Sequence, residues 1–283
     1  MKKVVAGVDI GGTNTVFGIV DNEGKVLAEG HLKTTDYPVV TDFVKAFSAA
    51  LKKLIATKKD IELTGIGIGA PDANFHRGTI EHAPNLAWKG IVPLADMVRK
   101  EMKVPVVLTN DANAAAMGEM VFGGAKGMKD FVVLTLGTGL GSGIVVDGKL
   151  VYGHTGFAGE VGHMTVVPNG RVCGCGRKGC FEAYASATGL VKTVSLMISE
   201  MRDESSLRDL PPAKLTSKAI AEAAAKGDPI AVKAMEYTAE KLGFGIVNTI
   251  VFTSPEAIFL FGGLAQAGEM LFEPEIGRAS CRE

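Results

Sequence analysis

The chain has 283 residues, of which 47% are hydrophobic, and its 30 basic and 31 acidic side chains leave a formal net charge of −1. This length suits one large domain or two lobes, and a nearly neutral charge favours neither nucleic acid nor an anionic membrane as a partner. No apolar run reaches the ~18 residues of a membrane span. The apolar start is interrupted at Asp9, so a signal peptide is not expected either.

Two segments have the same predicted construction. Residues 4–30 and residues 131–153 each read as a strand, a Gly/Thr-rich turn, a second strand, a tight turn and a third strand. The tight turns contain Asn22-Glu23-Gly24 and Asp147-Gly148, which are hairpin signals between apolar runs. The repeat predicts two lobes of related topology, and the alternative is a chance likeness of two glycine-rich hairpins.

Helices and strands alternate along the rest of the chain. Apolar spacing predicts helices from Thr41, from Asp111 to near Gly123, within 218–227 and from Pro229 to Val251. Strands are expected in 63–71, 104–110 and, as a buried strand, 256–264, while the polar segment 201–217 reads as a surface connection. The alternation predicts an α/β fold.

The first glycine-rich turn is the segment DIGGTN. Asp9 ends the first strand, and the turn continues through Gly11, Gly12, Thr13 and Asn14. Adjacent glycines can bring backbone amides close to phosphate oxygens, and an acid at a strand end can hold hydrated Mg²⁺ beside them. The turn Gly137-Thr138-Gly139 in LGTGLGSG offers a second such site. Either turn alone could be an ordinary hairpin, and neither fits a P-loop or a Rossmann motif.

Asp111 stands where a buried strand becomes a helix, in TNDANAAAMGE. An aspartate at this place often serves only as the N-cap of the helix. The functional alternative is a general base that accepts the proton of an attacking hydroxyl. Phosphoryl transfer needs little more from a protein than positioned phosphates, Mg²⁺ and such a base.

Three of the four cysteines gather shortly after a histidine, as His163, Cys173, Cys175 and Cys180. Such crowding indicates either a disulfide knot or a metal site. Disulfides would rarely be bunched in this way, so thiols kept reduced in the cytoplasm are expected. Three thiolates and one imidazole form the closed tetrahedral set typical of structural Zn²⁺. Unconnected surface thiols are the remaining alternative.

Two glutamates, Glu160 and Glu182, flank this cluster. They could be solvated charges. Carboxylates held rigidly by a metal-pinned loop would instead suit sugar hydroxyls as hydrogen-bond acceptors. His163 has a second ring nitrogen that could donate to a substrate oxygen, with the metal fixing its tautomer.

The segments DIGGTN, NDANAAAMGE, LGTGLGSG, GEVGH and CGCGRKGCFEAYAS, in this order, resemble the ROK family and, within it, the bacterial glucokinases. The resemblance covers Met1 to about Phe272. It implies an actin-like (ribonuclease H-like) ATPase fold of two lobes with mixed sheets and a central cleft. We place the lobes at 1–115 and 116–283. It also implies homo-oligomers, dimers or tetramers, that phosphorylate a hexose with ATP and Mg²⁺, most closely glucose at its 6-hydroxyl.

The resemblance assigns roles to individual residues. Asp111 matches the catalytic base, and His163, Cys173, Cys175 and Cys180 match the zinc ligands. The sugar-binding positions are matched by Asn85, Asn110, Asp111, Glu160, His163 and Glu182. The nucleotide-binding positions are matched by Asp9, Gly11, Gly12, Thr13, Asn14, Gly137, Thr138, Gly139, Gly262 and Gly263.

Two alternatives to a glucokinase stay open. One is a kinase for another hexose, such as N-acetylmannosamine, N-acetylglucosamine, fructose or mannose. The other is a non-catalytic sugar-binding protein, or a sugar-responsive regulator, of the same family. Residues 275–283 do not resemble the family's continuation, so we expect a shortened C-terminus.

Overall fold

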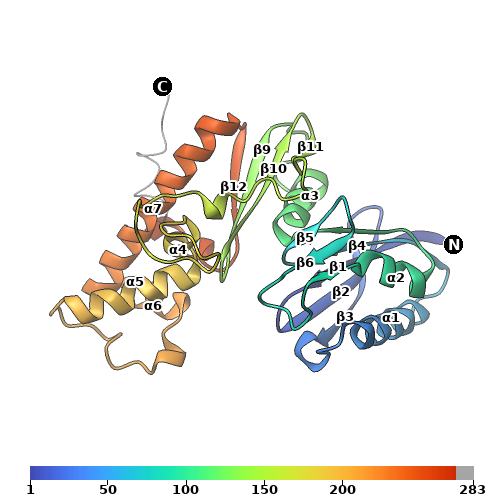
Figure 1. The fold of residues 1–283 in the computed structure, drawn as a ribbon, viewed down its shortest axis with the longest axis horizontal. Coiled ribbons are helices and arrows are strands. Elements are labelled where there is room, and N and C mark those ends of the chain that lie inside the picture. The colour runs from blue at the N-terminus through green and yellow to red at the C-terminus, as the bar shows by residue number, and fades with distance from the viewer. Residues whose placement is uncertain (272–283) are drawn as a thin grey trace. The chain divides into compact units, whose positions relative to one another are not determined.

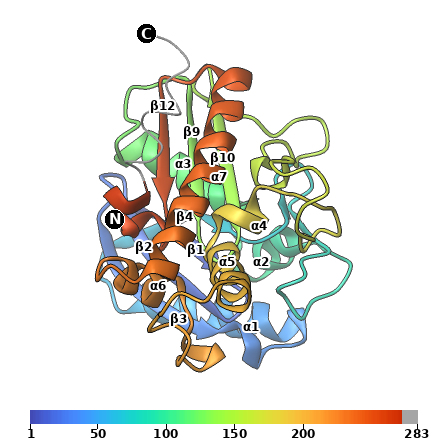
Figure 2. The ribbon, with the colours of Figure 1, turned by 90° about the vertical axis from the view of Figure 1, so that its left-hand side faces the viewer.

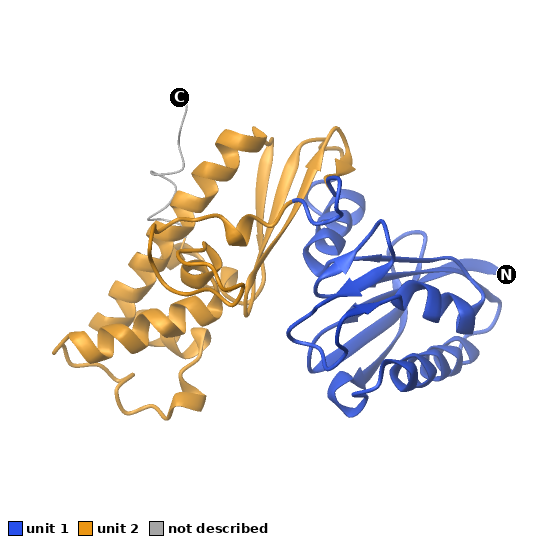
Figure 3. Ribbon diagram, in the orientation of Figure 1, with its two compact units in different colours: residues 1–126, 152–158 blue, residues 127–151, 159–283 orange. Residues whose placement is uncertain are grey.

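The computed structural model describes residues 1–271. Contacts divide the chain into two compact units, which Figure 3 colours separately. Unit 1 consists of residues 1–126 and 152–158, and unit 2 of residues 127–151 and the described residues from 159 onward. Residues 275–283, where we expected a departure from the family, lie outside the described residues.

The sheet of unit 1 has five strands in the order β3-β2-β1-β4-β8. The strands β1 (Lys2–Ile10), β2 (Asn14–Asp21) and β3 (Val26–Lys33) form an antiparallel meander. The strands β4 (Ile61–Gly69) and β8 (Val106–Thr109) continue parallel to β1. A small second sheet consists of β5 (Ala73–Asn74), β6 (Thr79–Glu81) and β7 (Ile91–Val92).

Two helices, α1 (Val40–Ala56) and α2 (Leu94–Met102), pack side by side in unit 1, as Figure 1 shows. The buried side of α1 carries Phe43 and Phe47. Phe47 meets Phe17 of β2 edge to face at 5.4 Å, and Phe43 lies 4.7 Å from the ring of Trp88. These aromatic contacts join the helix, the sheet and the loop after β6 in one core.

The sheet of unit 2 has four strands in the order β11-β10-β9-β12. They are β9 (Phe131–Leu136), β10 (Leu140–Val146), β11 (Lys149–Leu150) and β12 (Ala257–Phe261). The helices of this unit are α4 (Glu182–Ala185), α5 (Ala187–Glu200), α6 (Ser217–Ala224) and α7 (Pro229–Thr253). In Figures 1 and 2, α7 runs the length of the unit, and α4, α5 and α6 pack against it.

The repeated construction expected from the sequence is present. In each unit an antiparallel meander is followed by a strand that returns parallel to its first strand. Each glycine-rich turn therefore connects the first two strands of its sheet, between β1 and β2 and between β9 and β10.

Helix α3 (Asp111–Phe122) belongs to unit 1 as a whole. A side chain at Gly69 of β4 would lie 3.2 Å from Ala114 and 3.6 Å from the Cα atom of Asp111, so the start of α3 packs closely on β4. The expected lobe boundary at residue 115 falls inside this helix, whereas the contacts divide after residue 126.

The expectation of a buried last strand is wrong. All residues of β12 are half-buried except Phe261, which is 52% exposed. Among residues 1–271 the only strand paired with β12 is β9, so β12 is an edge strand of this sheet. The polar segment 201–217 also sends one residue, Leu207, into the core of unit 2.

The remaining short helices have 3-10 geometry: Thr34–Asp36, Val161–His163, Pro212–Lys214 and Ala265–Ala267. No helix within residues 1–271 has the length and apolar character required to cross a membrane.

Candidate functional site

The first glycine-rich turn lies beside the loop of Asn85. The turn is closed by a hydrogen bond of 2.9 Å from the Gly11 amide to the Asn14 carbonyl. The Thr34 amide, 2.8 Å away, donates to the Thr13 carbonyl and fixes the turn from outside. A Cβ atom on Gly12 would lie 2.6 Å from the Asn85 carbonyl oxygen, so only glycine fits there without a shift of backbone. Two expected ligand-binding segments are thereby brought together in unit 1.

Asn110 and Asp111 share the turn between β8 and α3. Asn110 is the N-cap, and its side chain accepts a hydrogen bond of 2.7 Å from the Asn113 amide. Asp111 is the first helical residue, and its Oδ1 atom accepts from the Ala112 amide at 2.8 Å. The interpretation of Asp111 as an N-cap is therefore wrong, because the neighbouring asparagine has that role.

Asp9 and Asp111 are close enough for their charges to interact. Burial raises the pKa of Asp9, and the negative charge of Asp111 raises it further. Two carboxylates near each other in a half-buried place favour a cation beside them. Oxygen ligands of this kind suit Mg²⁺, which fits the phosphate-binding role expected of this turn.

The cysteine cluster in unit 2 has the dimensions of a metal site. The ligand atoms of His163, Cys173, Cys175 and Cys180 all lie within 4.8 Å of one another. Cys173 Sγ is 3.8 Å from His163 Nδ1, and Cys175 Sγ is 3.7 Å from Cys180 Sγ. Tetrahedral zinc with bonds of ~2.3 Å to sulfur separates its ligand atoms by about 3.8 Å. These three cysteines are free thiols, so the disulfide alternative is wrong and the cluster fits Zn²⁺.

Backbone turns and one arginine hold the cysteine loop in place. The Cys173 amide donates to the Arg177 carbonyl at 2.8 Å, which closes the turn that carries Cys175. The Arg171 guanidinium stacks 4.6 Å over the Tyr184 ring and donates to Thr193 Oγ1 at 2.8 Å. Arg171 thus anchors the loop to α4 and α5. The sequence did not reveal this role, because an arginine beside cysteines looks like any solvated charge.

Burial raises the pKa of the Cys173 thiol to about 12. A thiol in that state is neutral at pH 7 and a weak ligand. Bound Zn²⁺ would hold the same sulfur as a thiolate, because metal ligation displaces the proton.

Glu182 connects the cysteine cluster with the second glycine-rich turn. Its Oε1 atom lies 3.5 Å from Cys173 Sγ, and its Oε2 atom accepts a hydrogen bond of 3.0 Å from the Leu140 amide. Its neighbour Phe181 is completely buried, and its ring occupies the space left by the missing side chain of Gly245 in α7. This packing fixes the start of α4 and, with it, the Glu182 side chain.

Glu160 and His163 lie on the loop that packs against β10. The Val161 amide donates to Ser142 Oγ at 3.1 Å, and the Glu160 carbonyl accepts from the His163 amide at 3.0 Å. The Nδ1 atom of His163 is the ring nitrogen that lies 3.8 Å from Cys173 Sγ, so it is the one that faces a thiol.

The two turns expected to bind nucleotide in unit 2 meet at the end of β9. In the turn Gly137–Gly139, the Gly137 carbonyl accepts from the Ala187 amide at 2.9 Å, and the Thr138 carbonyl accepts from Thr188 Oγ1 at 2.8 Å. The Gly262-Gly263 turn follows β12, and the next amide, that of Leu264, donates to the Leu136 carbonyl at 3.1 Å. The turn Gly137–Gly139 therefore lies beside the start of α5 and close to Glu182, and the Gly262-Gly263 turn lies beside Leu136 at the end of β9.

The expected site residues thus form one group in each unit. Unit 1 holds Asp9, Gly11, Gly12, Thr13, Asn14, Asn85, Asn110 and Asp111. Unit 2 holds Gly137, Thr138, Gly139, Glu160, His163, Cys173, Cys175, Cys180, Glu182, Gly262 and Gly263.

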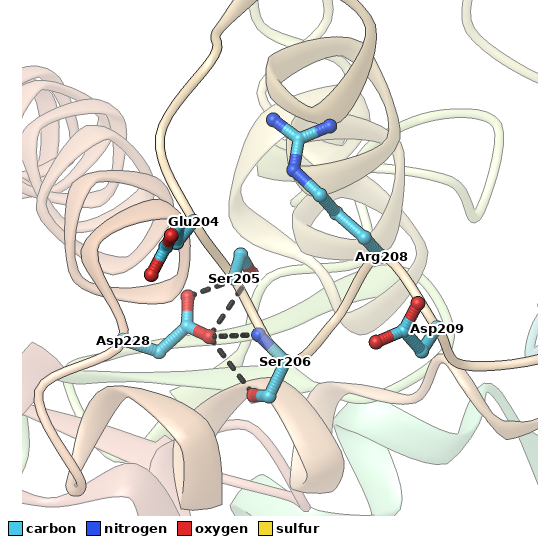
Figure 4. Close-up of a pocket in the computed structure, with 6 residues that line it drawn as sticks. All are labelled: Glu204, Ser205, Ser206, Arg208, Asp209 and Asp228. Carbon is cyan, nitrogen blue, oxygen red and sulfur yellow. Dashed lines mark hydrogen bonds between the residues drawn. The ribbon is translucent and has the colours of Figure 1, made fainter.

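A hollow of about 490 Å³ elsewhere in unit 2 contains none of these residues. Its lining, drawn in Figure 4, is Glu204, Ser205, Ser206, Arg208, Asp209 and Asp228. Asp228 is the N-cap of α7 and accepts hydrogen bonds from Ser205 Oγ and from the Ser206 amide. The hollow is formed by the connection between α5 and α6, and its hydrogen bonds serve to hold that connection.

The fold and the two glycine-rich turns define an actin-like ATPase architecture, a class of nucleotide-binding proteins. The chain belongs to the ROK family, whose model matches residues 5–279.

Two of its relatives are glucokinases. The glucokinase of Streptomyces coelicolor is 38% identical over 273 residues, which cover 95% of this chain and 84% of the relative. A ROK family glucokinase from Streptomyces griseus, crystallised with glucose and AMPPNP, superposes with a TM-score of 0.80 at 36% identity. That alignment covers 97% of this chain and 88% of the other.

A ROK family transcriptional regulator, a homologue of the E. coli MLC protein, is also similar. It has a TM-score of 0.87 at 26% identity and covers 99% of this chain, which matches 70% of the regulator.

Proposed function

We propose that this ROK protein phosphorylates glucose with ATP, giving glucose 6-phosphate and ADP. The observation that carries the proposal is the double contact of Glu182. One carboxylate touches both the metal-ligand cluster and the glycine-rich turn at Leu140. A rigid sugar-binding wall thereby adjoins a phosphate-binding turn. The similar glucokinase with glucose and AMPPNP supports the same assignment.

In unit 1, Asp111 is the general base. It accepts the proton of the glucose 6-hydroxyl while that oxygen forms a bond to the γ-phosphorus of ATP, and ADP leaves with the electrons of the broken bond. Asn110, whose side chain also caps α3, and Asn85 contact the sugar. The turn from Gly11 to Asn14 receives the phosphates.

In unit 2, Glu160 and Glu182 accept hydrogen bonds from sugar hydroxyls, and His163 donates one from Nε2. The turn Gly137–Gly139 lies against the phosphates, and Gly262-Gly263 lies near the adenosine. The glucose specificity rests on this wall, because carboxylates and an imidazole held at fixed positions discriminate between hydroxyl arrangements.

Two metal ions accompany this chemistry. His163, Cys173, Cys175 and Cys180 would hold Zn²⁺, which would supply rigidity to this loop. Asp9 would hold Mg²⁺ together with ATP, and this ion would neutralise phosphate charge. The reduced thiols required for the zinc cluster fit a cytoplasmic enzyme.

A hexose panel tests this proposal. With ATP and Mg²⁺, the kcat/KM measured from ADP release should be higher for glucose than for mannose, fructose, N-acetylglucosamine or N-acetylmannosamine. The product should be phosphorylated at the 6-position, as phosphorus NMR would show. Folded, zinc-loaded protein that releases no hexose-dependent ADP would contradict the proposal and favour a sugar-binding regulator, the second kind of protein that resembles this chain.

We also propose that the protein is a homo-oligomer, a dimer or tetramer. Light scattering coupled to size-exclusion chromatography gives the mass directly, and a mass near 29.6 kDa would identify a monomer and contradict this proposal.

A further inference from the structure

The segment Tyr152–Ala158, called the strap below, belongs to unit 1, although the residues on both sides of it belong to unit 2. Its two ends lie together, because the Ala158 amide donates to the Tyr152 carbonyl at 3.1 Å. On either side the chain is fixed to β10. The Val151 amide donates to the Ile144 carbonyl, and Ser142 Oγ donates to the Gly159 carbonyl. The strap is thus a compact loop whose two ends are held together by a hydrogen bond.

The strap packs on the loop after β5 through aromatic rings. The Phe75 and Tyr152 rings stack with centroids 4.1 Å apart and an angle of 8° between their planes. His76 meets both rings edge to face, at 5.9 and 5.8 Å. Phe75 is 38% exposed, so its ring rests on the strap more than it fills a core. A flat stack of this kind is sensitive to the loss of either ring.

Hydrogen bonds fix the same contact. His76 Nε2 lies 2.9 Å from the Gly153 carbonyl, and Asn74 Nδ2 donates to the Thr155 carbonyl at 2.9 Å. A Cβ atom on Gly156 would lie 2.6 Å from Asn74 Oδ1, so the strap backbone touches the asparagine side chain directly. Three consecutive residues, Asn74 to His76, therefore hold the strap.

The first residue of the strap, Tyr152, lies near the turn that carries the proposed base. Burial raises the pKa of Tyr152, and the nearby side chain of Thr109, the last residue of β8, partly offsets this rise. Thr109 directly precedes Asn110 and Asp111, and its Oγ1 atom is buried without a hydrogen-bond partner among the described residues. After its last residue, Ala158, the chain continues through Gly159 into Glu160.

From this arrangement we infer that Tyr152 is a positioning residue for sugar phosphorylation, acting with Phe75 through the strap. Its ring fixes the loop that leads into Glu160. The inference rests on the proposed function, because that function assigns Glu160 to the sugar.

The test compares variants by their kinetic constants. Tyr152→Leu and Phe75→Leu should each raise the KM for glucose by about two- to tenfold, the range expected for one aromatic pair. The KM for glucose of the double variant should be no higher than that of the more severely affected single variant, because either change removes the same stack. The KM for ATP should stay within twofold, since the contacts of the strap with Asn74, Phe75 and His76 involve none of the nucleotide-binding turns. Tyr152→Phe keeps the stack, so its KM for glucose should match the wild-type value.

Phe252→Leu is the matched control, because Phe252 is 91% exposed on α7 and its substitution should leave all constants unchanged. An unchanged KM for glucose in Tyr152→Leu, additive effects in the double variant, or an equal rise in the KM for ATP would overturn the inference. Failure of Tyr152→Leu to fold would leave Phe75→Leu and Tyr152→Phe to decide by the same criteria.

Hydrogen exchange separates this inference from the proposed function. Tyr152→Leu should speed amide exchange in Glu160–His163 by about the same factor as the KM change, without affecting the amides of Cys173–Cys180. If the wild-type protein phosphorylates no hexose, the proposed function fails, and the exchange result alone still confirms or overturns the role of the strap. Unchanged exchange at Glu160–His163 would overturn it.

Discussion

At the turn between β8 and α3, the adjacent residues Asn110 and Asp111 have different roles. Asn110 caps the helix through its side chain, so Asp111 is not required for the cap. The Asp111 carboxylate instead accepts a hydrogen bond from the Ala112 amide and lies close enough to Asp9 to raise the pKa of that residue. Because the Asp111 carboxylate does not cap the helix, it is available to accept a proton, as expected of a general base.

Replacement of Asp111 by Asn should therefore separate binding from turnover. We expect kcat to fall at least ~10²-fold, because the amide cannot accept the proton, while glucose binding measured by calorimetry stays within a few-fold. Asp42→Asn is a matched control, because Asp42 is also an acid in the first turn of a helix, on the exposed side of α1. Turnover of Asp111→Asn as fast as that of the control would remove Asp111 from the mechanism.

The metal cluster gives a second prediction at the residue scale. Purified protein should contain one zinc per chain, and Cys180→Ser should lose it, because Cys180 is buried and serine is a poor zinc ligand. The melting temperature should fall, and the KM for glucose should rise as Glu182 and His163 lose their support. Cys281→Ser should keep its zinc, since four ligands are already present. Zinc bound equally by both variants would contradict this assignment.

At the scale of elements, the start of α7 shows how one carboxylate can join two segments. Asp228 caps the helix by accepting from the Ala231 amide at 3.1 Å, and it also holds Ser205 and Ser206 of the preceding connection (Figure 4). Burial alone would raise the pKa of Asp228, but the hydrogen bonds from Ala231, Ser205 and Ser206 outweigh it and lower the pKa.

This lowered pKa sets the sign of a pH dependence. The stabilisation by the ionised carboxylate is complete above the unfolded-state pKa of about 3.9 and is lost as the pH falls through the lower folded-state value. Asp228→Ala should cost about 0.5–2 kcal/mol in the free energy of unfolding at pH 7, as measured in urea. Asp228→Asn keeps a capping side chain. The difference in the free energy of unfolding between this variant and the wild type should therefore shrink below about pH 4.

Asp209→Ala is the control for both measurements, because Asp209 is an exposed acid on the same hollow. A difference between wild type and Asp228→Asn that grows on acidification would contradict the assigned sign.

The elements themselves were largely predictable from the sequence. Apolar spacing predicted a helix from Thr41, where α1 begins at Val40, and a helix from Pro229, where α7 begins. The burial of β12 was not predictable, because the run AIFLF is equally apolar in a central and in an edge strand. The proximity of His163, Cys173, Cys175 and Cys180 was predictable because these four residues are close to one another in the sequence. The contacts of Arg171 depend on tertiary packing, which leaves no sequence pattern.

At the scale of the whole molecule, two separate hydrophobic cores correspond to the two units. The only tryptophan of the chain, Trp88, is 4% exposed in the core of unit 1, and its Nε1 atom donates to the Tyr37 carbonyl at 3.0 Å. Tryptophan fluorescence therefore reports on unit 1, whereas the cysteine cluster that would hold zinc lies in unit 2.

Zinc removal should consequently affect the two cores unequally. A chelator should speed hydrogen exchange in α4 and α5 while the emission maximum of Trp88 stays at its native wavelength. Addition of Zn²⁺ should reverse the change. A red shift of Trp88 in step with zinc loss would show that both cores unfold as one cooperative body and would contradict this prediction.

The sequence could predict the two-unit organisation from the repeated meander, but not the assignment of residues 152–158 to unit 1. The strap begins two residues after β11, and its glycines at 153 and 156 look like those of any surface turn. Its place is determined by the rings of Phe75 and His76, far away in the chain, and pairing of that kind cannot be read from one segment.

Gly245 has a consequence for attempts to make the protein more heat-resistant. A glycine in the middle of the 25-residue helix α7 looks like an easy target, because alanine usually strengthens a helix by about 1 kcal/mol. Here the added methyl group would collide with the Phe181 ring. Engineering by helix propensity would therefore trade a small gain in α7 for a displaced Glu182, and glycine should be kept at this position in any improved variant.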